Sequence, residues 1–251
     1  TGASNTAVGY HAGYNNSTGY SNIAMGRAAL YNNSIGAQNV ALGRESMFYN
    51  TGSQNTAVGY QALYNNTSGT QSVAIGYQAL YNNTTANNIG IGFGSGYNLT
   101  TGTVNTLVGY QAGYDITTGD QNTAFGYRTL YELTTADYNT AYGSQALRNA
   151  TTSTRNVAVG FNAGVGVTTG GYNTLIGSDA ADSLTTGANN VAVGYKALQN
   201  QTTGSSSVVI GNEAAQALGG NKAITAVGYK AGLYFNPTGT QTYGDVYVGI
   251  S

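Results

Sequence analysis

The chain of 251 residues contains no cysteine, no tryptophan and a single proline, and only 7% of its residues are charged. The absence of cysteine excludes a disulfide framework and a thiolate metal site. The 8 Lys and Arg residues nearly balance the 9 Asp and Glu residues, and the basic residues form no run. We therefore expect neither nucleic acid nor an anionic membrane surface as a partner. No apolar run approaches the length of a membrane span, so membrane insertion is not expected.

Glycine is abundant instead, and it marks a repeat of 17 residues. In the clearest copy an anchor glycine, Gly59, ends the segment 55–59 (NTAVG). The anchors recur every 17 residues, apart from two intervals of 16 and a last one of 21. A period this short indicates one structural unit per repeat, stacked on its neighbours. The anchors are Gly9, Gly26, Gly43, Gly59, Gly76, Gly92, Gly109, Gly126, Gly143, Gly160, Gly177, Gly194, Gly211, Gly228 and Gly249.

The residues before each anchor alternate in character as a β-strand does. The residue three before the anchor is β-branched, as Thr56 is, and the residue one before it is apolar or aromatic, as Val58 is. Side chains two positions apart share one face of a strand, and we expect this face to point into a core. The opposite face carries Ala and the anchor Gly, which predicts the close approach of another backbone. We assign this second face to contacts between copies of the chain, through Ala57, Gly59, Ala74, Gly76, Gly126, Ala192 and Gly194.

The residues after the anchor predict the rest of each coil. A small residue three after it, such as Ala62, predicts a second short strand, and the segment 65–69 (NNTSG) predicts a turn. Asn recurs four before the anchor, either as a ladder of stacked amides or as a turn residue. The expected fold is all-β, a parallel β-solenoid without helices whose coils stack at about 4.8 Å into a rod of roughly 70 Å.

The segment 55–67 (NTAVGYQALYNNT) resembles the repeats of phage tail-fibre and related bacterial surface-fibre proteins. The shorter NTAVG pattern is similar to the head repeats of trimeric autotransporter adhesins. The resemblance extends from Asn5 to Gly211. It implies a left-handed β-roll in a homotrimer, with the three chains side by side or intertwined. It also implies an extracellular location, on a virion tail fibre or a bacterial cell surface.

The repeat is regular over most of the chain and irregular near the C-terminus, which predicts two parts. Residues 1–232 form the repeat array, and residues 233–251 form an irregular last coil, a cap or a junction to a downstream domain. Pro237 lacks the donor that a ladder needs, so the coil is expected to open there. Three tyrosines in this irregular part are candidate ligand-binding residues: Tyr234, Tyr243 and Tyr247.

The sequence shows no convergent set of catalytic groups. The single histidine, His11, occupies a position that glutamines such as Gln61 hold in other repeats. The neighbouring acids Asp179 and Asp182 do not recur and match no calcium-loop pattern. We therefore expect no catalytic residue, no metal and no cofactor, and we interpret the chain as a non-enzymatic protein.

Two aromatic columns are the strongest indication of binding. A Tyr or Phe follows most anchors, and a second ring comes five after the anchor up to Tyr131. Tyrosine rings can stack on sugar faces while their hydroxyls form hydrogen bonds, although a column that recurs in every coil favours an architectural role. The candidate ligand-binding residues of the first column are Tyr60, Tyr77, Tyr110 and Tyr127.

The expected function is a structural fibre segment of a phage tail fibre or bacterial surface adhesin. Such a segment presents a receptor-binding tip and contacts host surface glycans or an outer-membrane receptor. Paired threonines, as at Thr100 and Thr101, leave an ice-binding solenoid as an alternative. A polysaccharide-processing enzyme is a weaker alternative, because the nine acidic residues are scattered over the chain.

Overall fold

The computed structural model describes residues 2–217, 223–233 and 245–249. Every regular element among them is a strand of three or four residues, and this part of the chain contains no helix. Each repeat supplies one strand, and neighbouring strands pair in parallel. The predicted all-β parallel solenoid is therefore confirmed. By their contacts the residues divide into two compact units, 1–122 and 123–251.

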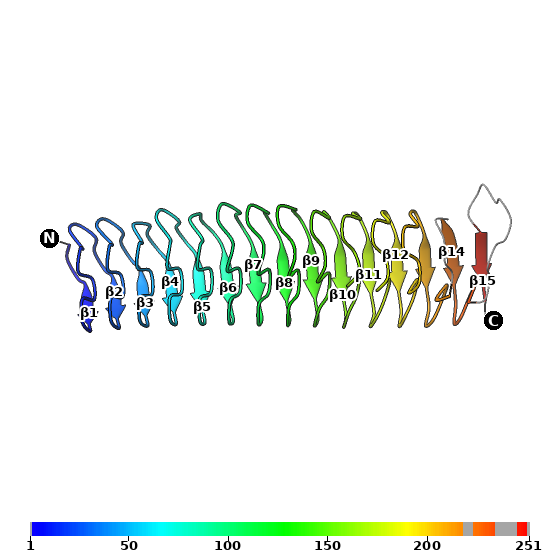
Figure 1. The fold of residues 1–251 in the computed structure, drawn as a ribbon, viewed down its shortest axis with the longest axis horizontal. Helices are drawn as coiled ribbons and strands as arrows, with labels where there is room; N and C mark the ends of the chain where they lie inside the picture. Colours follow the sequence, from blue (N-terminus) through cyan, green and yellow to red (C-terminus); the bar gives the residue numbers. More distant parts are fainter. Residues whose placement is uncertain (1, 218–222, 234–244, 250–251) are drawn as a thin grey trace. The chain divides into compact units, whose positions relative to one another are not determined.

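In the first unit seven strands stack side by side in chain order (Figure 1). Equivalent positions of neighbouring repeats pair, so Ala57 lies beside Ala74 and Val58 beside Ile75. This in-register stacking places each column of the repeat in a continuous row. The strands are β1 (Thr6–Val8), β2 (Ile23–Met25), β3 (Val40–Leu42), β4 (Thr56–Val58), β5 (Val73–Ile75), β6 (Ile89–Ile91) and β7 (Thr106–Val108).

The second unit is built in the same way. Its strands also pair in register, so Ala158 lies beside Leu175 and Ala192 beside Val209. The strands are β8 (Thr123–Phe125), β9 (Thr140–Tyr142), β10 (Val157–Val159), β11 (Thr174–Ile176), β12 (Val191–Val193), β13 (Val208–Ile210), β14 (Ile224–Val227) and β15 (Asp245–Val248).

The second strand predicted after each anchor is absent from the described coils, and that prediction was wrong. The chain there is a series of turns, in which Gln61 and Leu63 have φ of 52° and 51°. Left-handed residues at alternate positions bend the backbone too sharply for a strand, at a cost of roughly 1–2 kcal/mol each. The Leu63 side chain is fully buried, and its packing holds the chain in this conformation.

The prediction of which strand face points into the core was also wrong. The side chains three and one before the anchor lie outside, and Ile75 is 39% exposed. The alanine between them, Ala74, is 0% exposed. The interior of a coil of 17 residues is narrow, so it accommodates the small alanine side chains and leaves the branched ones outside.

Leucines of the turn segment fill the space that the alanines leave. Leu63 and Leu80, four after their anchors, are fully buried in this way. In two coils a leucine replaces the strand alanine, and a glycine then faces that leucine. A Cβ added to Gly113 would lie only 2.7 Å from Leu107 Cδ2, so the larger leucine leaves no room for a side chain there. Likewise a Cβ added to Gly164 would lie 2.5 Å from Leu175 Cδ1. Large side chains thus face small ones across the core, as close packing requires.

The anchor glycines are required for two reasons. Gly59 has φ of 134°, a conformation that side chains rarely adopt. A Cβ at Gly59 would also lie 2.4 Å from the carbonyl oxygen of Gly76 in the next coil.

Buried asparagines join successive coils. The Oδ1 atom of Asn39 accepts a hydrogen bond of 2.9 Å from the backbone N–H of Asn55. The Nδ2 atom of Asn55 donates to the carbonyl of Gly69 at 2.8 Å. The same contact recurs in the second unit, where the backbone N–H of Asn173 donates to Asn156 Oδ1 at 2.9 Å. The asparagine ladder among the predicted alternatives is therefore confirmed.

Candidate functional site

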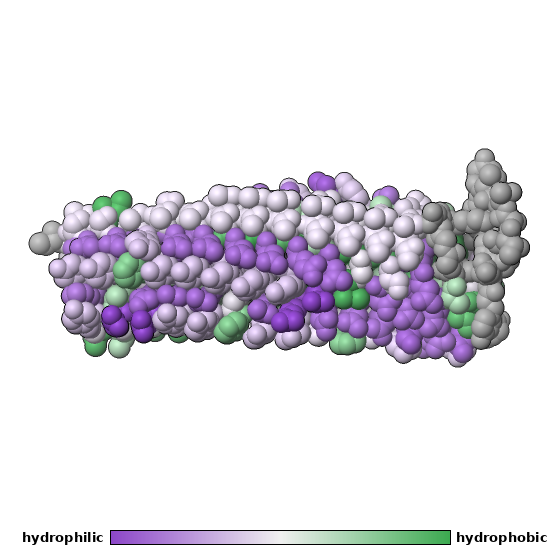
Figure 2. Space-filling model, in the orientation of Figure 1, coloured by the Kyte–Doolittle hydropathy of each residue, from purple (hydrophilic) through white to green (hydrophobic). Residues whose placement is uncertain are grey.

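The outer face of the solenoid is the row of strand side chains three and one before each anchor, such as Val73 and Ile75. These side chains are half-buried or exposed, and Val208 and Ile210 of the second unit are 38% and 40% exposed. No charged residue occurs in either column of β1–β15. On the face that Figure 2 shows, side chains of like hydropathy form rows that cross the coils of each unit. The residue one before the anchor is apolar or aromatic in every strand, whereas the residue three before it is Thr in seven of the fifteen strands and Val or Ile in the others. The column one before the anchors therefore leaves a long apolar row at the surface of each unit.

The residues that the sequence assigned to contacts between copies face inward or pack on their own chain. Ala57, Ala74 and Ala192 are each 0% exposed within a single chain. The backbone that approaches each anchor is the next coil of the same chain: a Cβ at Gly76 would lie 2.5 Å from the Gly92 carbonyl oxygen. The same holds for Gly59, Gly126 and Gly194. The alanines therefore lie in the core of their own chain rather than at an interface, and the anchor glycines lie against the next coil.

The first aromatic column, directly after the anchors, forms a stack. The ring centroids of Tyr60 and Tyr77 lie 5.1 Å apart, those of Tyr77 and Phe93 5.0 Å, and those of Phe93 and Tyr110 5.1 Å. The ring of Tyr77 remains 44% exposed. In the second unit Tyr127 is exposed and lies 5.3 Å from the guanidinium of Arg128.

The second aromatic column, five after the anchors, stacks in the same way. From Tyr64 to Tyr81, Tyr97 and Tyr114 the centroid distances are 5.1, 5.0 and 5.2 Å. The interplanar angles are 1°, 11° and 6°. Such parallel stacks tie each coil to the next and support the architectural interpretation.

Stacking limits how these rings can meet a ligand. A sugar ring inserted between two aromatic rings needs about 4 Å on each side. The two aromatic rings would then have to be about twice that distance apart, which is more than the spacing of the stacked rings. Within the columns the ring faces are therefore occupied by their neighbours. Ring edges and hydroxyls are what Tyr60, Tyr77 and Tyr110 offer to a ligand along the stack.

Polar side chains two after the anchors lie between the two aromatic columns. At the first coil His11 lies 3.9 Å from the ring of Tyr10 and 4.6 Å from that of Tyr14. Further along, Gln78 Nε2 donates to Gln61 Oε1 at 2.8 Å, and Gln61 Nε2 donates to Glu45 Oε2 at 2.9 Å. His11 thus occupies the glutamine position, as the sequence predicts, and the glutamines form an amide ladder flanked by aromatic rings.

Two phenols of the second column, those of Tyr64 and Tyr81, have a raised pKa. Burial, with smaller contributions from Tyr49, Tyr81 and Glu45, raises the pKa of Tyr64 to about 12. Burial also raises the pKa of Tyr81. Burial of Glu45 opposes its ionisation, but the hydrogen bond from Gln61 and the ion pair with Arg44 together lower its pKa.

A cluster of Tyr138, Arg155 and Tyr172 was not predicted from the sequence. The Arg155 guanidinium lies 4.9 Å from the Tyr138 ring and 5.4 Å from the Tyr172 ring, and Nη1 is 3.1 Å from the Tyr172 hydroxyl. These residues lie five before their anchors, where most other repeats carry Gln, Ser or Asn. The change of residue type at this position was the available signal.

The paired threonines have two distinct environments. The first hydroxyl of a pair donates to a carbonyl of the next coil, as from Thr151 to Thr168 at 3.1 Å and from Thr168 to Thr185 at 3.2 Å. The second threonine is exposed, as Thr152 and Thr169 are. The exposed threonines form one row with one member per coil.

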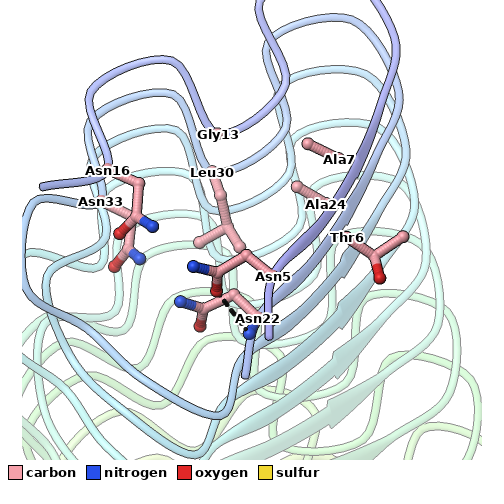
Figure 3. A pocket seen from close by; sticks show the side chains of 9 residues that line it. All are labelled: Asn5, Thr6, Ala7, Gly13, Asn16, Asn22, Ala24, Leu30 and Asn33. Carbon is pink, nitrogen blue, oxygen red and sulfur yellow. Dashed lines mark hydrogen bonds between the residues drawn. The ribbon is translucent and has the colours of Figure 1, made fainter. Parts of the chain in front are cut away.

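A small pocket opens at the first coil (Figure 3). The amides of Asn5 and Asn16 line it with those of Asn22 and Asn33, while Thr6 points away from them. The Asn22 backbone N–H donates to Asn5 Oδ1 at 2.8 Å. These are the same amide groups that link one coil to the next elsewhere in the solenoid.

The described residues include no group of three or more His, Cys, Asp or Glu side chains that could hold a metal ion. Of the three candidate tyrosines near the C-terminus, Tyr234 and Tyr243 lie outside the described residues. Tyr247 lies in β15 with its ring close to Gly232, where an added Cβ would be 3.0 Å from Tyr247 Cδ2.

No family model, curated protein or solved structure matches the chain. Within the described residues no helix is long and apolar enough to cross a membrane.

Proposed function

We propose that the chain is a non-enzymatic segment of an extracellular fibre, in which three parallel copies pack through their outer faces. The observation that supports this proposal is the apolar, uncharged row that every described strand contributes to. In a single chain this row leaves side chains such as Ile75 and Ile210 in water. Burial of such a row against a protein partner stabilises an assembly by about 25 cal/mol per Å² of apolar surface.

A second copy of the same chain is the partner that fits this row best. The side chains recur once per coil, so a copy in register meets each Val or Ile with the same spacing. A cyclic arrangement buries the row of every copy at once. The resemblance to trimeric fibre repeats supplies the number three and the left-handed roll. Phage tail fibres and bacterial surface adhesins are the settings in which such a segment holds a receptor-binding tip away from the particle or cell.

The test replaces apolar side chains of the outer face by lysine. A variant with Val73→Lys and Val191→Lys changes one outer-face residue in each unit. We expect light scattering to show a monomer, because three buried lysines at each substituted level would carry like charges without partners. The control variant, Thr67→Lys with Thr152→Lys, adds the same charge at exposed turn positions and should assemble as the unchanged chain does.

Two results would contradict the proposal. A monomeric unchanged chain excludes the trimer, and normal assembly of the outer-face variant excludes this interface. Hydrolysis of a host polysaccharide by the purified chain would contradict the non-enzymatic role.

The exposed threonine row supports a second candidate function, ice binding. Thr135, Thr152, Thr169 and Thr186 are exposed at equivalent positions of successive coils. A regular row of hydroxyls and methyl groups can order water in a lattice. Thermal hysteresis that disappears in a Thr152→Lys and Thr169→Lys variant would favour this function over the fibre.

A further inference from the structure

Four successive coils of the first unit carry both aromatic columns together. We call them the aromatic strip: the coils with Tyr60 to Tyr110 in the first column and Tyr64 to Tyr114 in the second. The residues one, two and five after these anchors include no charged side chain. The strip therefore offers neutral hydrogen-bonding groups between two rows of rings.

The strip has a constant spacing. Its six stacked ring pairs have centroid distances between 5.0 and 5.2 Å. The interplanar angles are 11° or less except for 29° between Tyr60 and Tyr77. Ring edges and hydroxyls therefore recur in nearly the same orientation from one coil to the next, and a straight ligand with the same period meets equivalent groups along its length.

The polar groups of the strip recur with the coils as well. Gln61 and Gln78 each use one N–H of the side-chain amide in the ladder. A primary amide has two N–H groups, so each keeps a second donor for a ligand. The first-column ring of Tyr77 is 44% exposed, and its hydroxyl adds a donor and an acceptor.

We propose that the aromatic strip binds an extended, neutral β-1,4-linked polysaccharide of glucose-type sugars, with the polymer parallel to the stacking direction and one sugar on each coil. Such a polymer is straight, and it advances per sugar by nearly the distance between stacked rings. Successive sugars are turned over, so each sugar presents equatorial hydroxyls to the amides and phenols, and the same hydroxyl edge recurs at every second coil. The C–H groups of the sugars contact the ring edges. The inference rests on the proposed function, because it requires a fibre segment exposed to polysaccharides outside a cell.

The same argument predicts which polysaccharides are rejected. A β-1,3-linked or an α-1,4-linked glucan curls, so its sugars leave register with the coils after one or two contacts. A polyanionic polysaccharide gains little, because the cation that lies against the strip, Arg44 at 5.6 Å from the Tyr60 ring, is paired with Glu45. The strip therefore selects polysaccharides by their linkage. Chitin-type polymers, which carry acetamido groups, and cellulose-type polymers, which carry hydroxyls instead, share this linkage, so the binding of each is measured separately.

The experiment is affinity electrophoresis of the intact chain in native gels that contain one soluble polysaccharide each. Hydroxyethylcellulose and glycol chitin are the β-1,4-linked polymers, and laminarin and soluble starch are the controls. We expect retardation by one or both β-1,4-linked polymers and by neither control. Titration with cello-oligosaccharides should show an affinity that rises from two sugars to four.

The variant that tests the site is the triple change Tyr60→Phe, Tyr77→Phe and Tyr110→Phe. The first column already contains Phe93, so the stack is expected to persist while three hydroxyls are lost. We expect retardation to weaken by about tenfold, as the loss of one or more hydrogen bonds implies. The control is Tyr195→Phe, at an exposed first-column position whose neighbours are Ser178 and Asn212. It should bind as the unchanged chain does.

Three outcomes would overturn the inference: no retardation by either β-1,4-linked polymer, equal retardation by all four polymers, or unchanged binding of the triple variant. Light scattering on the same samples separates this inference from the proposed function. A trimer that binds no β-1,4-linked polymer refutes the site and leaves the fibre proposal in place, whereas a monomer refutes the fibre proposal.

Discussion

Two stretches of the solenoid fill the same buried turn position with different chemistry. In the first five repeats the residue seven after the anchor is Asn, and in the next six it is Leu, Ile, Ala or Val. In the first stretch Asn66 Oδ1 accepts from the Gly69 N–H at 2.9 Å, and Asn66 Nδ2 donates to Asn50 Oδ1 at 2.8 Å. In the second stretch the corresponding Gly170 N–H donates to the Thr185 carbonyl of the next coil at 3.4 Å.

The difference shows that the coil shape does not depend on one kind of interior. The turn needs a partner for its glycine N–H and a side chain that fills the core. Asn66 meets both needs at once. An apolar side chain fills the core only, and the next coil then supplies the acceptor.

The largest expected effect comes from a cavity in the apolar stretch. Leu184 is fully buried, and a Cβ at Gly187 would lie 2.5 Å from its Cδ1 atom. We expect Leu184→Ala to lower the free energy of unfolding of the second unit by roughly 2–5 kcal/mol. Native-state hydrogen exchange should show the loss in the coils next to Leu184, because each coil contacts only its neighbours. A loss below that seen for an exposed Thr186→Ala control would contradict tight packing there.

In the asparagine stretch the matching change is Asn66→Ala. It leaves the Gly69 N–H without its acceptor and removes the donor to Asn50. We expect a loss of roughly 1–3 kcal/mol in the free energy of unfolding of the first unit. The amide hydrogen of Gly69 should exchange faster than in the unchanged chain. Unchanged exchange at Gly69 would mean that the side chain is not its partner.

Replacing an apolar residue at this turn position by asparagine should lower the free energy of unfolding less than Leu184→Ala or Asn66→Ala does. Val167→Asn places an amide three residues before Gly170, as Asn66 stands three before Gly69. The new side chain gains the turn hydrogen bonds while apolar burial is lost, so we expect a change of about 1 kcal/mol. A cost as large as that of Leu184→Ala would show that the amide needs asparagine neighbours above and below.

The smallest expected effect appears only at alkaline pH. The pKa of Tyr64 in the folded chain is about 12, against an ordinary value of 10.0. Because the folded pKa is the higher one, the stability from the neutral phenol is complete below pH 10.0 and is lost as pH rises towards about 12. Tyr64→Phe should show a smaller loss of stability over this range in denaturant titrations. An identical loss in both proteins would contradict the burial of the Tyr64 phenol.

The repeat, the parallel stacking, the absence of helices from the described residues and the asparagine ladder could all be predicted from the sequence. They follow from the period and from residue types such as the β-branched Val73 column. The direction of the faces could not be predicted, because alternation shows that two faces differ without showing which is inside. Ala57 was therefore placed at an interface and lies in the core. The left-handed turn at Leu63 was missed because leucine gives no signal of a positive φ. The aromatic stacks could be predicted from the two aromatic columns of the repeat. That the stacked rings leave no room for a sugar between them could be seen only from the ring distances in the structure.

Multi-angle light scattering of the unchanged chain tests the central claim, that the apolar outer face joins three copies, most directly. We predict a mass three times the 25.7 kDa of one chain, reduced to the mass of a single chain by Val73→Lys with Val191→Lys. A stable, soluble monomer of the unchanged chain, with its outer face in water, would contradict the claim.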